Sequence, residues 1–300
     1  MSGQLVTMQV AIHLGAHCTD EDRLLRSLLQ NIDVLSKQGI NVPGPSRYRN
    51  ILRKASTALK GDPPSDDTLE TIREAILDDD QAERVVLFND DFICVHSRIF
   101  ENSLLYEKSN YKAEWLRALF PDDQVEFFIG IRNPATFIPA AFHHKKQTLG
   151  DFYDFINNTD LTDIRWSDVI LSIQESNPGC PITVWCNEDT PLIWPEVMQD
   201  ISGVEPFTRL MGGFNILGTI MHRDGMRRLR GYLHSHPPQT ETQRRRIIAA
   251  FLDKFAITDE IEEELDVPGW TEELVEELTD HYEEDLYEIQ KMPGVKFIAP

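Results

Sequence analysis

The 300-residue sequence is poor in cysteine, in positive charge and in long apolar runs. Its four cysteines, Cys18, Cys94, Cys180 and Cys186, form no C-x-x-C pair, which argues against a zinc ribbon or a disulfide framework. The first residues show no basic segment followed by an apolar one, and no apolar run reaches the length needed to span a membrane. We therefore expect a cytoplasmic protein with reduced thiols and no membrane insertion.

The shortage of positive charge limits the partners. With 29 Lys and Arg against 50 Asp and Glu, the formal net charge is −21, which repels nucleic acid and anionic lipid. We expect no nucleic-acid partner. Much of the acid lies between Thr258 and Ile289, either as solvated helix faces or as an acidic C-terminal surface that binds a protein partner.

Common catalytic motifs are also missing. There is no G-x-S-x-G, no G-x-G-x-x-G and no complete G-x-x-x-x-G-K-[ST], so hydrolase, Rossmann and kinase-type sites lack support. His13, His17, Cys18 and Asp20 carry metal-binding atoms, but they lie on a strand and a turn rather than on one helix face. We expect no metal site.

Apolar β-prone runs alternate with helical patterns along the chain, and hydrophobic residues make up 41% of it. Strands are predicted at Leu5–Leu14, Arg84–Phe88, Gln124–Pro134, Pro181–Asp189 and Gly294–Pro300. Leucines and isoleucines at helical spacing predict a helix from Leu24 to Gly39. This order predicts a three-layer α/β/α fold with a mainly parallel sheet.

The predicted organisation has two parts. Residues 1–202 form the α/β core, and residues 203–300 form a mainly helical region with a short final strand, packed on the core. Ligands of such sheets bind beyond the carboxyl ends of the strands. Four segments are expected to converge there: Gly15–Asp22, Asn89–Asp91, Arg132–Pro134 and Cys186–Asp189.

The first strand and its loop read "IHLGAHCTDEDRLL", and the third strand ends in "IRNP". The chain resembles the bacterial sulfotransferase-like family of the P-loop-related fold, whose loop follows H-x-G-x-H-K-T-G-T-T-x-L and whose third strand ends in R-x-P. The resemblance implies binding of 3′-phosphoadenosine 5′-phosphosulfate (PAPS). The implied cofactor-binding residues are Gly15, Ala16, His17, Cys18, Thr19, Arg132 and Asn133.

The loop departs from the family pattern in its charged positions. Cys18 replaces the lysine that stabilises charge on the bridging oxygen, and Asp20, Glu21 and Asp22 replace Gly-Thr-Thr. Each like-charge contact with a dianion costs on the order of 1 kcal/mol even when screened. A structural explanation is that Thr19 or Asp20 caps the next helix and that two carboxylates stabilise its first turn. Ala140 replaces the serine that follows the R-x-P segment.

Two functions remain open. The first is a sulfotransferase that moves the sulfuryl group of PAPS to a hydroxyl of a saccharide, lipid or small metabolite, with His17, Asp90 or His96 as the base. The second is a catalytically inactive binding or assembly protein on the same scaffold, which has lost the PAPS site.

Arginines are concentrated in two segments, "HRDGMRRLRGYL" and "TQRRRIIAAFL". They form either a local patch for an anion or ion pairs with the glutamate-rich helices of the chain itself.

Overall fold

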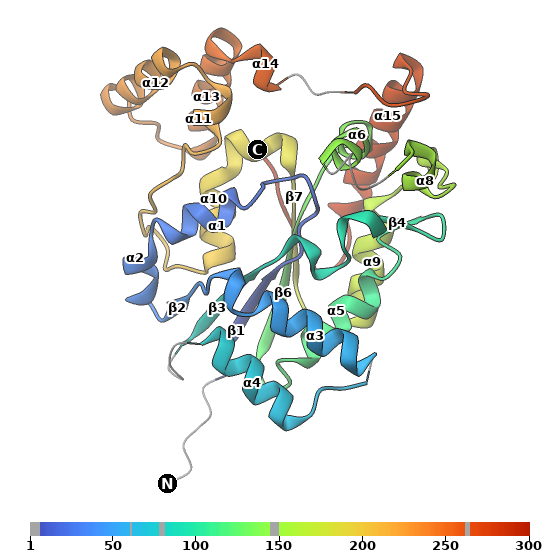
Figure 1. The fold of residues 1–300 in the computed structure, drawn as a ribbon. Coiled ribbons are helices and arrows are strands. Elements are labelled where there is room, and N and C mark those ends of the chain that lie inside the picture. Colours follow the sequence, from blue (N-terminus) through green and yellow to red (C-terminus); the bar gives the residue numbers. More distant parts are fainter. Residues whose placement is uncertain (1–6, 61, 78–81, 145–149, 262–264) are drawn as a thin grey trace.

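The computed structural model describes residues 7–60, 62–77, 82–144, 150–261 and 265–300. At its centre lies a six-stranded parallel sheet in the order β2-β3-β1-β6-β7-β8, with helices on both faces (Figure 1). Its strands are β1 Gln9–His13, β2 Ile40–Asn41, β3 Arg84–Phe88, β6 Gln124–Ile131, β7 Ile182–Cys186 and β8 Val295–Ile298. The predicted α/β fold with a parallel sheet is confirmed. Leu5 and Val6, where the first strand was expected to begin, lie outside the described residues.

The longer helices of the first 202 residues are α1 Arg23–Leu29, α2 Ile32–Ser36, α3 Arg49–Leu59, α4 Asp66–Ile76, α5 Ser109–Ala118, α6 Pro134–His144, α8 Phe152–Ile156, α9 Trp166–Ser176 and α10 Thr190–Ser202. Short 3-10 turns are η1 Pro45–Arg47, η2 Asp90–Phe92, η3 His96–Arg98, η4 Leu161–Asp163 and η5 Asn187–Asp189. A small antiparallel hairpin joins β4 Phe100–Glu101 to β5 Leu104–Leu105.

The central strand shows why an uninterrupted apolar run forms a buried strand. Val10 and Ile12 pack into the hydrophobic cluster on one face of the sheet, whereas Ala11 packs into the cluster on the other. All three side chains are fully buried. Because helices cover both faces of the sheet and β3 and β6 pair with both edges of β1, the middle of this strand is apolar on both faces.

Helices α3, α4, α5, α6, α9 and α15 cover one face of the sheet, and α1, α2 and α10 cover the other. On the first face Trp166 of α9 is fully buried against Phe137 of α6, with ring centroids 5.3 Å apart. On the second face Trp194 of α10 packs with Trp185 of β7 in one cluster. The two layers of helices enclose the sheet and give the chain its main core.

The residues after Gly203 form two separate groups of elements. Helices α11 Leu217–Ile220, α12 Arg223–Ser235 and α13 Glu241–Phe255 pack around a separate small apolar cluster, and α14 Thr258–Ile261 contacts α11. Helix α15 Glu272–Ile289 instead packs on α6 and α9, and β8 pairs in parallel with β7. Figure 1 shows α11 to α14 above the carboxyl ends of the strands and α15 apart from them, along the side of the sheet. Most of the acidic C-terminal segment lies on α15; Glu262 to Glu264 lie outside the described residues.

The helix predicted from Leu24 to Gly39 is wrong as a single element, because the chain breaks between α1 and α2. Asn31 lies at the break, and its side chain donates hydrogen bonds to the carbonyls of Ser27 and Met211, at 2.8 and 2.9 Å. Its side-chain oxygen accepts from the backbone N–H of Met211 at 2.6 Å. Side-chain hydrogen bonds to a loop 180 residues further along the chain therefore take the place of the backbone hydrogen bonds that would continue one helix.

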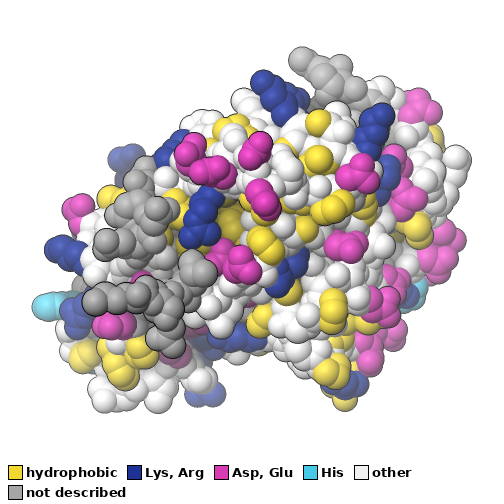
Figure 2. Space-filling view, turned by 90° about the horizontal axis from the view of Figure 1, so that it is seen from below, with side chains coloured by type: hydrophobic (Ala, Val, Ile, Leu, Met, Phe, Trp, Pro, Cys, Tyr) yellow, Lys and Arg dark blue, Asp and Glu magenta, His cyan; other side chains and the backbone are white. Residues whose placement is uncertain are grey.

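On the amino-terminal side of the sheet, the described residues place charged side chains of both signs. In Figure 2, seen from this side, Lys and Arg side chains lie among Asp and Glu side chains, and apolar side chains are scattered between them. Among the described helices, none combines the length and the apolar character needed to cross a bilayer. The charged features that concern a ligand lie at the opposite edge of the sheet.

Candidate functional site

A cavity of about 720 Å³ opens at the carboxyl ends of β1, β6 and β7. After β1 the chain passes to β2 and β3 on one side of the sheet, and after β6 it passes to β7 and β8 on the other. The cavity thus lies at the point where the strand order reverses, which is the usual ligand site of open α/β sheets. Its walls are the loop after β1, the ends of β6 and β7, the start of α10, and parts of α11, α13 and α14.

Three of the four segments that we expected to converge line this cavity. Cys18 to Glu21 come from the loop after β1, Arg132 follows β6, and Asn187 and Glu188 follow β7. The fourth segment, Asn89–Asp91, follows β3 and contributes no residue to the wall that the described chain forms.

Gly15 and Ala16 extend the pairing of β1 with β6 beyond the end of the strand. The backbone N–H of Ala16 donates to the carbonyl of Gly130 at 2.8 Å, and the N–H of Gly130 donates to the carbonyl of Gly15 at 2.7 Å. Gly15 has a φ of +106°, a conformation open to glycine and strained for other residues. The loop N–H of Ala16, expected to bind the cofactor, is therefore used by the sheet.

The carboxylate of Asp20 binds a backbone N–H group at the start of α1. Its carboxylate accepts a hydrogen bond from the backbone N–H of Leu24 at 2.8 Å, and the side chain is buried. Burial raises the pKa of Asp20 to about 6, although the bonds from Leu24 and from its own backbone N–H pull in the other direction. Thr19 or Asp20 was expected as the N-cap itself, which is wrong: the N-cap is Asp22, and Asp20 reaches the start of the helix from two residues before it.

Glu21 and Asp22 were expected in the first turn of the helix, and this prediction is wrong. Glu21 and Asp22 have φ values of +50° and +62°, so both precede the helix, which begins at Arg23. A left-handed backbone cannot continue a right-handed helical turn. Glu21 forms an ion pair with Arg23 at 3.2 Å on the surface of the loop.

Arg132, the residue expected to hold a donor phosphate, braces the loop. Its Nη1 donates to the carbonyl of Cys18 at 2.5 Å, and its Nε donates to Thr136 Oγ1 at 3.1 Å. Thr19 closes the same turn, since its hydroxyl donates to the carbonyl of Ala16 at 2.7 Å. The guanidinium thus fixes the conformation of the loop from the end of β6.

Asn133 forms hydrogen bonds with both its side chain and its backbone N–H. Its side-chain oxygen accepts from the backbone N–H of Ala135 at 2.9 Å at the start of α6, and its side-chain nitrogen donates to Thr279 on α15. Its backbone N–H donates to Glu188 Oε1 at 2.7 Å. Burial raises the pKa of Glu188, and the bond from Asn133 opposes that shift.

The residues expected to act as a base lie on the other side of the loop, away from the cavity wall. The hydroxyl of Tyr106 accepts the backbone N–H of His17 at 3.1 Å and lies 2.7 Å from its Nδ1. The Nε2 atom of His17 lies 3.5 Å from Asp91 Oδ1. The His96 ring meets the His17 ring edge-on, 5.1 Å between centroids, and its Nε2 is 2.6 Å from the carbonyl of Ala141.

Asp90 lies close to a buried imidazole. Burial raises the pKa of Asp90, and the charge of Asp20 raises it further, whereas His13 and His17 lower it. The His13 ring is buried between Phe88 and Trp185, with centroids 5.2 and 5.6 Å away, and its burial lowers the pKa of His13 to about 4. His13 is thus neutral at physiological pH.

The charge of the cavity wall is negative. It contains the guanidiniums of Arg23 and Arg132 against five carboxylates, those of Asp20, Glu21, Glu188, Asp253 and Glu260. A dianionic phosphosulfate needs an excess of donors and cations. The described donor set does not fit that group, because both guanidiniums already bond to groups of the loop and carboxylates outnumber them.

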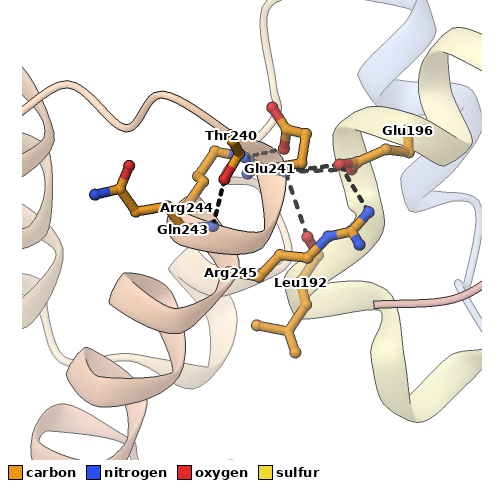
Figure 3. A network of polar contacts seen from close by, with 7 residues as sticks. All are labelled: Leu192, Glu196, Thr240, Glu241, Gln243, Arg244 and Arg245. Carbon is orange, nitrogen blue, oxygen red and sulfur yellow. Dashed lines mark hydrogen bonds and ion pairs between the residues drawn. The ribbon is translucent and has the colours of Figure 1, made fainter.

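The arginines of α13 are paired, but with a partner that the sequence did not indicate. Figure 3 shows Arg244 and Arg245 directed at Glu196 of α10, with nitrogen–oxygen distances of 3.1 Å. Arg244 also donates to Glu241 at 2.5 Å, and Thr240 caps the helix through the N–H of Gln243. On α12, Arg227 and Arg228 pair with Asp224. The network around Glu196 attaches α13, and with it one wall of the cavity, to the core.

Sequence reasoning missed the outer wall and one aromatic side chain of the cavity. Asp253 and Glu260 belong to helices that carry no motif, and their approach to the sheet depends on tertiary packing alone. Trp194 lines the cavity while being 1% exposed, and within the described chain its indole nitrogen has no acceptor. Searches of protein-family models, of curated proteins and of solved structures each found no match to this chain.

Proposed function

We propose that this protein is a catalytically inactive binding protein, built on a sulfotransferase-like α/β scaffold whose donor loop is closed by its own side chains. The observation that carries the proposal is the bond from the Leu24 N–H to the Asp20 carboxylate. In phosphate-binding loops, the backbone N–H groups at the start of the helix point at the ligand. Here an aspartate of the loop takes up one of these donors.

The surrounding charges support the same proposal. Arg132 bonds to the Cys18 carbonyl, and Cys18 itself stands where the family pattern has a lysine. An incoming dianion would meet Asp20 and Glu21 at the loop and Glu188 opposite. Repulsion from several carboxylates in a partly desolvated cleft makes binding of PAPS unfavourable by several kcal/mol, at roughly 1 kcal/mol or more for each close pair.

The test is a calorimetric titration with 3′-phosphoadenosine 5′-phosphate, the product of the donor. We expect no heat of binding at millimolar nucleotide and no shift of the thermal midpoint. The reciprocal variant carries Cys18→Lys, Asp20→Gly, Glu21→Thr and Asp22→Thr, and we expect it to gain measurable affinity. If it folds and gains none, the loop is not what prevents donor binding.

The fourfold variant changes many contacts, so Asp20→Asn serves as a milder companion. An asparagine keeps an oxygen for the Leu24 N–H and removes one negative charge. We expect it to fold like the parent chain and still not bind the nucleotide, because Glu21 and Glu188 remain. Tight binding by the parent chain or by this variant would contradict the proposal.

A second candidate function is sulfuryl transfer from PAPS to a hydroxyl acceptor. One observation favours it: Arg132 lies on the cavity wall beside the β1 loop, where the family pattern has its phosphate-binding arginine. This function requires His17, Asp90 or His96 to reach an acceptor, and therefore a rearrangement of the loop. Transfer of labelled sulfuryl from PAPS to any hydroxyl acceptor, abolished by Arg132→Ala, would establish it in place of the binding function.

A further inference from the structure

We propose that this protein forms a symmetric dimer, in which the loop between α10 and α11 of one copy packs against the same loop of a second copy. The two-fold axis passes beside Phe207, near the middle of this loop. None of the residues that carry the inference belongs to the cavity wall formed by the described chain, so it does not depend on the proposed function.

Four large apolar side chains are exposed at one corner of the molecule, where the loop after α10 passes beside α1 and α2 (Figure 1). They are Leu29 at the end of α1, Ile32 at the start of α2, and Phe207 and Met211 on the loop, with exposed fractions of 40%, 38%, 96% and 61%. We call these four residues the apolar corner. Single exposed apolar residues are common, whereas a group of them on one surface indicates an interaction site.

Hydrogen bonds hold the loop against the two helices. Asn31, at the break between α1 and α2, accepts the backbone N–H of Met211 at 2.6 Å and donates to its carbonyl at 2.9 Å. Gln38, after α2, binds the loop on both sides of the phenylalanine. Its side-chain oxygen accepts the backbone N–H of Glu205 at 2.9 Å, and its nitrogen donates to the hydroxyl of Thr208 at 3.1 Å. The loop and the helices therefore present one fixed surface.

The backbone of Phe207 is strained as well as exposed. Its φ is +68°, in the left-handed region that a bulky side chain rarely adopts. The residue is 96% exposed, so no burial within its own chain offsets either the strain or the exposure of the ring. Backbone strain of this kind is concentrated at binding sites, and large aromatic side chains are frequent anchors of protein interfaces.

The charges beside Phe207 identify a second copy as the partner. Glu205 precedes it by two residues and Arg209 follows it by two, and both side chains are exposed. Within the described chain neither forms an ion pair. A two-fold axis beside Phe207 brings Glu205 of each copy opposite Arg209 of the other. The segment is therefore complementary to itself, as a two-fold interface requires.

The surface around the apolar corner lacks the negative charge of the whole chain. The formal net charge of −21 makes two copies repel each other at most orientations. The exposed charged residues of α1, of the loop, and of α2 with the residue that follows it are Arg26, Lys37 and Arg209 against Asp33 and Glu205. Three cations against two carboxylates leave this surface slightly positive, so two copies can approach each other here.

The first experiment measures the mass of the chain by sedimentation velocity from about 5 to about 500 µM at about 0.15 M salt. We expect an equilibrium between monomer and dimer in this range. A monomer at every concentration would overturn the inference. Growth beyond the dimer would also overturn it, because an interface that uses the same surface on both copies closes at two.

Two exposed aromatic residues provide a matched pair of variants. Phe207→Ser removes the central side chain of the proposed interface, and we expect it to weaken dimerisation by at least about tenfold. Tyr287→Ser removes a side chain that is 61% exposed on α15, outside the apolar corner, and should leave dimerisation unchanged. Circular dichroism and the thermal midpoint establish that both variants fold. Equal effects of the two changes, or none from Phe207→Ser, would contradict the assigned surface.

The two-fold axis has a test of its own in the charges. Glu205→Arg and Arg209→Glu each place like charges opposite one another, and we expect each to weaken dimerisation by at least about tenfold. In an equimolar mixture of the two variants every cation again meets a carboxylate, so dimers that contain one chain of each should form. If overall charge alone governed association, Glu205→Arg would strengthen it. That result, or a mixture that stays monomeric, would overturn the symmetric arrangement.

Discussion

Asp20 Oδ2 lies 2.8 Å from the backbone nitrogen of Leu24, so the loop after the first strand satisfies the start of α1 with its own carboxylate. The charge is held in a buried position, where its pKa is raised to about 6. This one contact links the conformation of the loop, the stability of the protein and the choice of ligand.

Asp20→Asn is expected to change how stability depends on pH. Because the folded pKa is raised above the unfolded one, the folded state binds the proton more readily, and this group lowers stability as pH rises from about 4 through 6. The variant lacks this loss, so its stability relative to the parent should increase by about 1.4 kcal/mol between pH 5 and 7.5. Urea denaturation at the two pH values measures the difference; a constant offset would contradict the assigned pKa.

His13→Phe is expected to show the opposite dependence. Burial between Phe88 and Trp185 lowers the pKa of His13 to about 4, so the parent loses stability as pH falls below the unfolded pKa of about 6.5. The phenylalanine variant does not titrate, and should gain about 2 kcal/mol relative to the parent between pH 7.5 and 5. The same denaturation series tests it, and parallel curves for the two proteins would show that His13 is not buried neutral.

Glu196→Gln is expected to loosen α13 from α10. The carboxylate faces both Arg244 and Arg245, and its side chain is 22% exposed against 13% and 17% for the arginines. Removing the charge takes the more buried carboxylate away from both guanidiniums and leaves Arg244 with only the more exposed Glu241, a loss of about 1–3 kcal/mol in the free energy of unfolding.

Glu241→Gln is the control for that change. Glu241 pairs with the same Arg244, but its side chain is 60% exposed. We expect a loss within about 0.5 kcal/mol. Chemical denaturation of both variants decides the matter, and similar losses would mean that burial of the Glu196 network has no energetic effect.

Two glycines of α12 should respond in opposite ways to alanine. A Cβ at Gly225 would lie 2.8 Å from Cγ of Phe255 and 3.0 Å from Cγ of Met221, so α12 and α13 would have to separate. At Gly231 nothing lies within 4 Å. We expect Gly225→Ala to cost about 1–3 kcal/mol and Gly231→Ala to stabilise by about 0.5–1 kcal/mol. Thermal denaturation gives both signs, and stabilisation by both alanines would refute the close packing of the helices.

Much of the sheet was predictable from local pattern. The strand at Arg84–Phe88 was predicted with its observed bounds, because a short apolar run with β-branched residues between polar segments favours a buried strand. Ser65 is a residue type typical of helix caps, and its hydroxyl accepts from the N–H of Thr68 at the start of α4. These features depend on neighbours in sequence, which a pattern records.

The errors and omissions depend on distant contacts. The break at Asn31 is stabilised by Met211, and the outer cavity wall depends on Glu196 holding α13 to α10. The two-residue strands β4 and β5 are too short to carry a periodic signal. In the loop, the sequence predicted a helical cap but not the left-handed backbone that places Glu21 and Asp22 before the helix.

The position of β8 at the edge of the sheet also affects how the chain is made. Residues Val295–Ile298 pair with β7, whose residues are synthesised more than 100 positions earlier. Until β8 pairs, one side of β7 has unpaired backbone groups beside apolar side chains, which is the kind of edge that pairs with other chains. A variant that lacks Val295–Ile298 therefore exposes this edge and is expected to aggregate more readily than the chain that carries β8.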